Sequence, residues 1–167
     1  MISPLAYVDP EAKLGQNVEV GPFAYIEKGV VIGDNCVIKS HASILEGTTM
    51  GSGNIVYQNA VIGATPQDFH YVEGTSTKVV IGNDNRIREN VVIAGSTYPD
   101  KATIIGDSNF IMDRVHICHD VHIFNKCVVG IGACIAGIYH QHRRLNECQT
   151  KKHRIDQRAG GYRLRHD

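Results

Sequence analysis

The sequence predicts an all-β protein, a parallel β-helix in which short strands coil into a triangular prism. The main observation is a ladder of aliphatic residues spaced six apart, unbroken from Ile2 to Ile62. The ladder resumes at Ile81 and, after a second interruption, at Ile105. A period of six matches neither the 3.6-residue period of a helix nor the two-residue alternation of an ordinary strand. It is typical of the hexapeptide repeats that form β-helices.

The repeat fixes the expected geometry of each element. Each hexapeptide should form one strand and one corner, so that about three hexapeptides complete a coil and residues about eighteen apart stack. The ladder side chains then point inward, where β-branched residues suit a buried pleated surface. A glycine often follows the ladder residue, and we expect it to serve a tight turn or a positive φ. The ladder residues are Ile2, Val8, Leu14, Val20, Ile26, Ile32, Ile38, Ile44, Met50, Val56, Ile62, Ile81, Ile87, Ile93, Ile105, Ile111, Ile117, Ile123, Val129 and Ile135.

Two insertions interrupt the repeat and divide the chain. Residues 2–63 are uninterrupted repeat, residues 64–77 break it, and residues 78–93 restore it. Residues 94–103 form a second break, and the repeat then continues to residue 137. The total length of repeat predicts roughly six coils. Insertions in a solenoid protrude as loops and often form a binding face, so both breaks are candidate binding loops.

The charge distribution separates the repeat from the end of the chain. Residues 1–137 carry nine Lys and Arg against fourteen Asp and Glu, whereas residues 138–167 carry eight against three. The next ladder positions, Gln141 and Glu147, are polar. We therefore expect a β-helix domain at residues 1–137 and an irregular basic tail at residues 138–167, which is disordered or encoded out of frame.

Composition excludes several classes of function. The formal net charge is +0, which gives no general reason to expect a nucleic-acid partner. The N-terminus starts with the repeat and shows neither a signal peptide nor a membrane span. The five cysteines include no CxxC pair, and Cys36 and Cys127 occupy inward positions of the repeat. We expect these two to be buried reduced thiols of a cytoplasmic protein.

Histidines and a carboxylate cluster around one ladder residue. His116 and His122 flank Ile117 and lie six residues apart, and His119 directly precedes Asp120. A carboxylate beside a histidine can fix its tautomer and stabilise the imidazolium, which is the arrangement of a general base. The same residues could also be solvated surface histidines, or metal ligands shared between neighbouring chains.

Three motifs and the opening segment make a resemblance to one family specific. The motifs are Ile62-Gly63 with Pro66-Gln67-Asp68, Ile87-Arg88-Glu89-Asn90-Val91, and His116-x-x-His119-Asp120, and the opening segment is residues 1–7. The sequence resembles the acyl-carrier-protein–UDP-N-acetylglucosamine O-acyltransferases of lipid A biosynthesis, over residues 1 to about 137. The repeat alone is common to many acyltransferases, whereas the combined motifs are much narrower.

The resemblance implies a left-handed coil, a reaction and a set of roles. His119 would act as the general base on the sugar 3-hydroxyl, which attacks the thioester of an acyl carrier protein. Asp120 would orient His119, and the backbone N–H of Gly137 would stabilise the oxyanion. His116 would help to position the substrate, and Asp68 would lie near the acyl chain.

The resemblance also implies partners, and the sequence departs from the family at several positions. Gln67 and His70 would complete the substrate-binding set, although His70 stands where the family has a lysine that faces the nucleotide phosphates. Ala94-Gly95-Ser96 replaces a polar segment, and Ile138 replaces a histidine. Expected partners are the acyl carrier protein, the nucleotide sugar and two further copies in a homotrimer. The carrier thioester is a co-substrate, and we expect no cofactor and no metal.

Two other classes of function remain open at this point. The first is another hexapeptide enzyme, either a coenzyme A-dependent acetyltransferase or a zinc hydratase. The second is an inactive truncated paralogue that acts as a trimeric binding protein. The motif of the first loop and the Ile87-Arg88-Glu89 segment argue against the first alternative. The second is favoured because the family's later coils and its C-terminal helical domain have no counterpart after residue 137.

Overall fold

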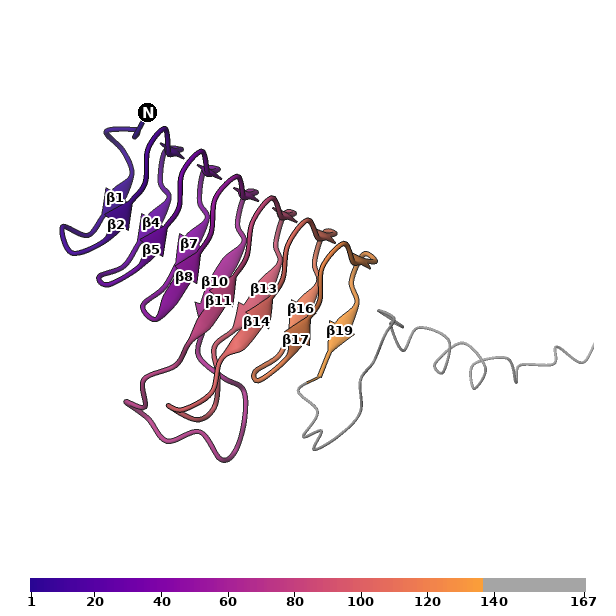
Figure 1. Ribbon diagram of the computed structural model, residues 1–167. Coiled ribbons are helices and arrows are strands. Elements are labelled where there is room, and N and C mark those ends of the chain that lie inside the picture. Colours follow the sequence, from indigo (N-terminus) through magenta and orange to yellow (C-terminus); the bar gives the residue numbers. More distant parts are fainter. Residues whose placement is uncertain (137–167) are drawn as a thin grey trace, which may run out of the picture.

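The computed structural model describes residues 1–136, and within that range the chain forms a solenoid of nineteen short strands (Figure 1). The strands belong to three sheets that the chain visits in strict rotation, so each coil adds one strand to each sheet. The result is six complete coils and one further strand. This confirms the predicted parallel β-helix of roughly six coils.

The three sheets run along the length of the solenoid. Sheet 1 contains β1 (Tyr7–Val8), β4 (Tyr25–Ile26), β7 (Ser43–Ile44), β10 (Val61–Ala64), β13 (Val92–Ala94), β16 (His116–Ile117) and β19 (Cys134–Ile135). Sheet 2 contains β2 (Lys13–Leu14), β5 (Val31–Ile32), β8 (Thr48–Met50), β11 (Val79–Ile81), β14 (Thr103–Ile105) and β17 (His122–Ile123). Sheet 3 contains β3 (Glu19–Val20), β6 (Val37–Ile38), β9 (Ile55–Val56), β12 (Arg86–Ile87), β15 (Phe110–Ile111) and β18 (Val128–Val129).

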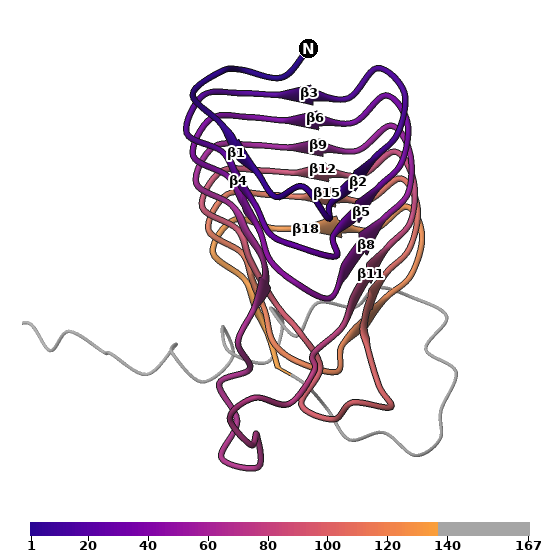
Figure 2. The same ribbon diagram turned by 90° about the vertical axis from the view of Figure 1, so that its left-hand side faces the viewer.

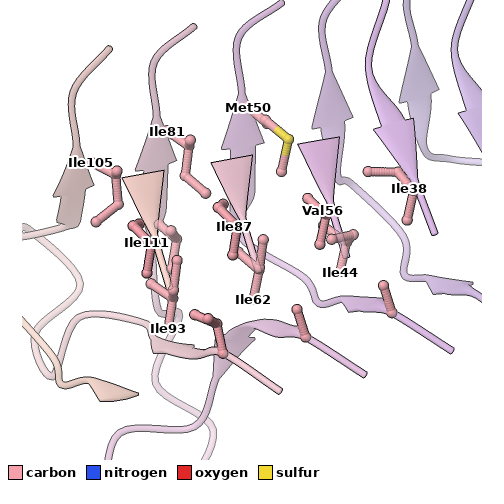
Figure 3. Packing of buried hydrophobic residues seen from close by; sticks show 14 of the residues in the cluster. Ile38, Ile44, Met50, Val56, Ile62, Ile81, Ile87, Ile93, Ile105 and Ile111 are labelled. Atoms are coloured by element: carbon pink, nitrogen blue, oxygen red, sulfur yellow. The ribbon is translucent and has the colours of Figure 1, made fainter. Parts of the chain in front are cut away.

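The ladder residues form the core. All of them from β1 onward lie in strands, while Ile2 joins Val20 through an isolated parallel bridge. Ile62, Ile87 and Ile105 come from the three sheets and point into one interior (Figure 3). Each of these three side chains is at most 1% exposed, and burial of such a side chain is worth about 1.5–3 kcal/mol.

The corners have positive φ, but at a different residue from the glycines where it was expected. All eleven non-glycine residues with positive φ in the described chain, Asp120 among them, lie three residues before a ladder residue. Most glycines that follow a ladder residue do not have positive φ, Gly63 being the exception. A Cβ at Gly82 would lie 2.9 Å from the backbone of Gly106 in the next coil. Close packing between coils, and not positive φ, therefore explains most of these glycines.

Both insertions emerge at the same corner of the prism. The first loop, residues 65–78, joins β10 to β11, and the second, residues 95–102, joins β13 to β14. Both connections run from sheet 1 to sheet 2, and we call this edge of the prism the loop corner (Figure 2). Each loop differs by one residue at either end from its predicted range. The register resumes after them, since Val61 pairs with Val92 and Val92 pairs with His116.

The remaining expectations for the fold concern the cysteines, the end of the chain and a membrane span. Cys36 and Cys127 are buried, as the repeat predicted. Gly137 and the tail at residues 138–167 lie outside the described residues. No helix in residues 1–136 has the length and apolar character needed to cross a membrane.

Candidate active site

Three successive passes of the chain at the loop corner build one polar cluster. The first loop supplies Asp68, the second supplies Thr97, and the short corner between β16 and β17 supplies His119 and Asp120. These residues are separated by up to 52 positions in sequence. They meet because the solenoid stacks the same corner of consecutive coils.

His119 and Asp120 form the centre of the cluster. The His119 Nδ1 atom lies 2.9 Å from the Asp120 Oδ2 atom. Asp120 has φ 56° and lies at the turn between β16 and β17. The Asp120 backbone N–H donates to the Thr103 hydroxyl at 2.9 Å, which fixes the corner against β14. Both side chains are about one-fifth exposed, at 22% and 18%, so the imidazole is partly shielded yet accessible.

Thr97 links the two loops to this pair. Its side chain is buried, and its hydroxyl Oγ1 atom lies 3.0 Å from the Asp68 Oδ2 atom and 2.9 Å from the His119 Nδ1 atom. Its backbone N–H donates to the Asp120 Oδ2 atom at 3.3 Å. A single residue of the second loop therefore contacts every other member of the cluster.

Asp68 is ionised and held from two sides. The backbone N–H of His70 donates to its Oδ1 atom, and the His70 Nδ1 atom also lies 3.0 Å from that oxygen. These contacts with His70, assisted by the Thr97 hydroxyl and the nearby His119 imidazole, lower the pKa of Asp68 to about 2, although burial opposes them. The Asp68 Oδ2 atom lies 3.7 Å from the His119 Nε2 atom. The imidazole thus has a carboxylate near each of its nitrogens.

The arrangement can perform proton transfer. With Asp120 at Nδ1, the Nε2 atom of His119 is left to accept a proton from a nucleophile, and the nearby carboxylates would stabilise the imidazolium that forms. Within residues 1–136, no three His, Cys, Asp or Glu side chains are placed to hold a metal ion.

The repeat places the chain in a known family. Residues 2–102 match the family described as the GMPPB C-terminal domain, which is more than half of the chain. The chain belongs to this family. The match covers the first four coils and both loops, the part of the chain that positions Asp68 and Thr97.

Individual relatives are more specific than the family. An acyl-[acyl-carrier-protein]–UDP-N-acetylglucosamine O-acyltransferase of Pseudomonas putida (strain W619) is 51% identical over 140 residues, which are 83% of this chain and 54% of the relative. A solved UDP-N-acetylglucosamine acyltransferase from Bacteroides fragilis has TM-score 0.79 and 49% identity, covering 82% of this chain and 53% of that one. The corresponding enzyme from Campylobacter jejuni has TM-score 0.71 and 38% identity, covering 77% and 50%.

These relatives confirm two expectations from the sequence. The resemblance to the acyltransferases of lipid A biosynthesis is correct, and the coil is the left-handed β-helix of those structures. The chain spans about half the length of the curated relatives it matches.

Of the remaining residues expected in the site, one joins the cluster and the others do not or lie outside the described residues. His70 joins it through Asp68, although its own side chain is 77% exposed. Gln67 is exposed on the first loop. His116 is half-buried in β16, in register with Val92 and Cys134. Among the hydrogen bonds of the described residues, none joins the His116 side chain to the cluster. Gly137 lies beyond the described residues.

Two threonines of the site were not predicted. Thr97 belongs to the second loop, and Thr103 begins β14. A polar residue within an inserted loop is a weak signal, because most such residues face solvent. Only the stacking of coils at the loop corner shows that both threonines are buried against the His119–Asp120 pair.

Proposed function

We propose that the chain is an acyltransferase that moves a 3-hydroxyacyl group from an acyl carrier protein to the 3-hydroxyl of UDP-N-acetylglucosamine, the first step of lipid A biosynthesis. The observation that carries the proposal is the His119–Asp120 pair, held with the Asp68 carboxylate at the loop corner. Relatives named acyl-[acyl-carrier-protein]–UDP-N-acetylglucosamine O-acyltransferase support it, since the similarity extends across this corner.

His119 is the general base of the proposed reaction. Its Nε2 atom accepts the proton of the sugar 3-hydroxyl while that oxygen attacks the thioester carbonyl carbon. The carbonyl π electrons move to oxygen, and the Gly137 backbone N–H stabilises this oxyanion. When the carbonyl re-forms, the C–S bond breaks, and the thiolate of the carrier leaves with the proton that His119 returns. The products are an ester and a free thiol, and the base is regenerated.

Four further residues would bind the substrates. Asp68 would lie near the acyl chain and the reacting hydroxyl, because its Oδ2 atom is 3.7 Å from the base. Gln67 and His70 neighbour it on the same exposed loop and would contact the nucleotide sugar. His116 lies in the strand immediately before the catalytic corner and would help to position the acceptor.

The proposal includes an assembly and a compartment. We propose a homotrimer in which the loop corner of one chain faces a neighbour, since closed cyclic assembly is the usual way to bury the repetitive flat faces of such a prism. The carrier thioester is the co-substrate, and the mechanism uses no metal or cofactor. Buried Cys36 and Cys127 fit a reducing compartment, and we place the protein in the cytoplasm.

The direct test is acyl transfer by the purified chain. A 3-hydroxyacyl carrier protein and UDP-N-acetylglucosamine are supplied, and free thiol and acylated sugar nucleotide are measured together. We expect one thiol for each ester formed. Release of thiol without acylated sugar would contradict the proposal. Equal turnover with an acetyl coenzyme A donor would favour the coenzyme A-dependent class instead, and a stoichiometric zinc content would favour the hydratase.

A further inference from the structure

We infer that Thr97 is a positioning residue, which sets the tautomer of His119 and keeps the nearby Asp68 carboxylate from moving into hydrogen-bonding distance of its reactive nitrogen. The inference deepens the proposed function and rests on it, because it assumes that His119 is the base. It concerns a buried threonine whose hydroxyl contacts Asp68 and His119 and whose backbone N–H donates to Asp120.

The hydrogen atoms around Thr97 can be assigned from their partners. A threonine hydroxyl has one hydrogen, and an ionised carboxylate only accepts. Asp68 is ionised at neutral pH, since the His70 contacts hold its pKa well below the ordinary value. The Thr97 hydroxyl therefore donates its hydrogen to the Asp68 Oδ2 atom, at 3.0 Å. Its lone pairs are left to face the His119 Nδ1 atom, at 2.9 Å.

This assignment fixes the tautomer of the imidazole. The His119 Nδ1 atom faces two oxygens, the Thr97 hydroxyl and the Asp120 Oδ2 atom, each at 2.9 Å. Both are acceptors toward the ring, so Nδ1 must carry the hydrogen and Nε2 must carry the lone pair. Two acceptors at the same nitrogen select this tautomer more firmly than Asp120 alone would.

The same hydroxyl restrains Asp68. The Oδ1 atom of Asp68 is held by His70, and Thr97 is the partner of its Oδ2 atom, which lies 3.7 Å from the His119 Nε2 atom. Without the hydroxyl, that oxygen would gain most by moving toward Nε2 and pairing with a proton there. A base whose lone pair is already occupied cannot accept the proton of the sugar hydroxyl.

The second loop is anchored to the solenoid, which holds Thr97 in place between Asp68 and His119. The Ser96 hydroxyl accepts from the Lys78 backbone N–H at 3.1 Å, which ties the loop to the end of the first loop. The Thr97 backbone N–H also supports Asp120. At 2% exposed, the Thr97 side chain is shielded from water that could replace its hydrogen bonds.

The kinetic test compares variants of Thr97 in the full chain. Thr97→Val removes the hydroxyl at nearly constant volume and should lower kcat by about ten- to a hundredfold, the range for one hydrogen bond to a charged group, with little change in KM. Thr97→Ser retains the hydroxyl and should restore most of the rate. Thr48→Val is the matched control, because Thr48 is equally buried but its hydroxyl has no hydrogen-bond partner. If Thr97→Val does not fold, Thr97→Ala takes its place.

A second measurement is independent of catalysis. Imidazole ¹H–¹⁵N correlation spectra, with the His119 signal identified by its loss in His119→Ala, report which ring nitrogen is protonated. We expect the Nδ1–H form in the wild type and in Thr97→Ser, and a gain of Nε2 protonation in Thr97→Val. An unchanged His119 spectrum in Thr97→Val, or a rate that Thr97→Ser does not restore, overturns the inference. A wild-type chain without transferase activity contradicts the proposed function, while the spectra still decide the role of Thr97.

Discussion

Removal of the His119 side chain separates the chemistry of the site from the stability of the fold. His119→Ala should lower the transfer rate by about 10²–10⁴-fold, the usual contribution of a general base. The solenoid should remain folded, since the side chain is 22% exposed and does not belong to the aliphatic core. Its loss leaves the Asp120 Oδ2 atom with the Thr97 backbone N–H as a donor, so destabilisation should be about 1 kcal/mol.

Asp120→Asn should be less severe, and the structure gives the reason. The change removes a charge and weakens one of two acceptors at the His119 Nδ1 atom, while the Thr97 hydroxyl remains at 2.9 Å. A hydrogen bond to a charged group is worth about 1.5–3 kcal/mol, which corresponds to a rate loss of about ten- to a hundredfold. The rates should therefore fall in the order wild type, Asp120→Asn, His119→Ala.

Initial rates with the carrier thioester and thermal unfolding of the same preparations test both changes. His122→Ala is the control, because His122 is a nearby exposed histidine of β17 that stacks on Phe124 outside the cluster. Its rate should equal that of the wild type. Retention of most of the wild-type rate by His119→Ala, or a larger loss in Asp120→Asn than in His119→Ala, would refute the assignment of His119 as the base.

Three further predictions concern stability and assembly. The folded pKa of Asp68 is about 2 and lies below its unfolded value, so its contribution to stability is complete above about pH 4 and is lost as the pH falls toward 2; thermal unfolding of Asp68→Asn should lack this acid-dependent loss. Ile93→Ala should cost about 2–5 kcal/mol in urea unfolding because Ile93 is 0% exposed, whereas Val80→Ala, at 42% exposed, should cost less than about 1 kcal/mol. Light scattering should give the mass of a trimer at micromolar concentration, and a monomer would contradict the proposed assembly.

The fold could be predicted from the sequence because one rule governs all of it. A ladder residue in a coil must stack on its counterpart in the next, so a six-residue period determines the strands, the sheets and the core together. The positive φ expected at the glycines was wrong in most cases, because the sequence shows that a side chain is missing but not why. At Gly82 the reason is the backbone of the next coil, which no local pattern reveals.

The candidate site was only partly predictable. His119 and Asp120 are neighbours in sequence, so their pairing could be predicted without knowledge of the fold. Asp68 was predicted from the family resemblance of the first loop. Thr97 could not be found in this way, since its partners lie 29, 22 and 23 residues away. Irregular loops carry no period, and their contacts follow only from the edge of the prism at which both emerge.

The two loops and the His119–Asp120 pair lie on successive coils, and this limits where a coil can be duplicated without disrupting the site. Each coil advances about 4.8 Å along the axis, so Asp68 and His119 start from backbone levels about 10 Å apart, and the loops close the gap to 3.7 Å. A coil duplicated before residue 65 would leave that spacing intact. A coil duplicated between residues 79 and 116 would move the two halves apart by about 4.8 Å and separate the carboxylate from the imidazole. Duplication and recombination can therefore lengthen the solenoid before the first loop and leave the site intact, but not between the first loop and the His119–Asp120 pair.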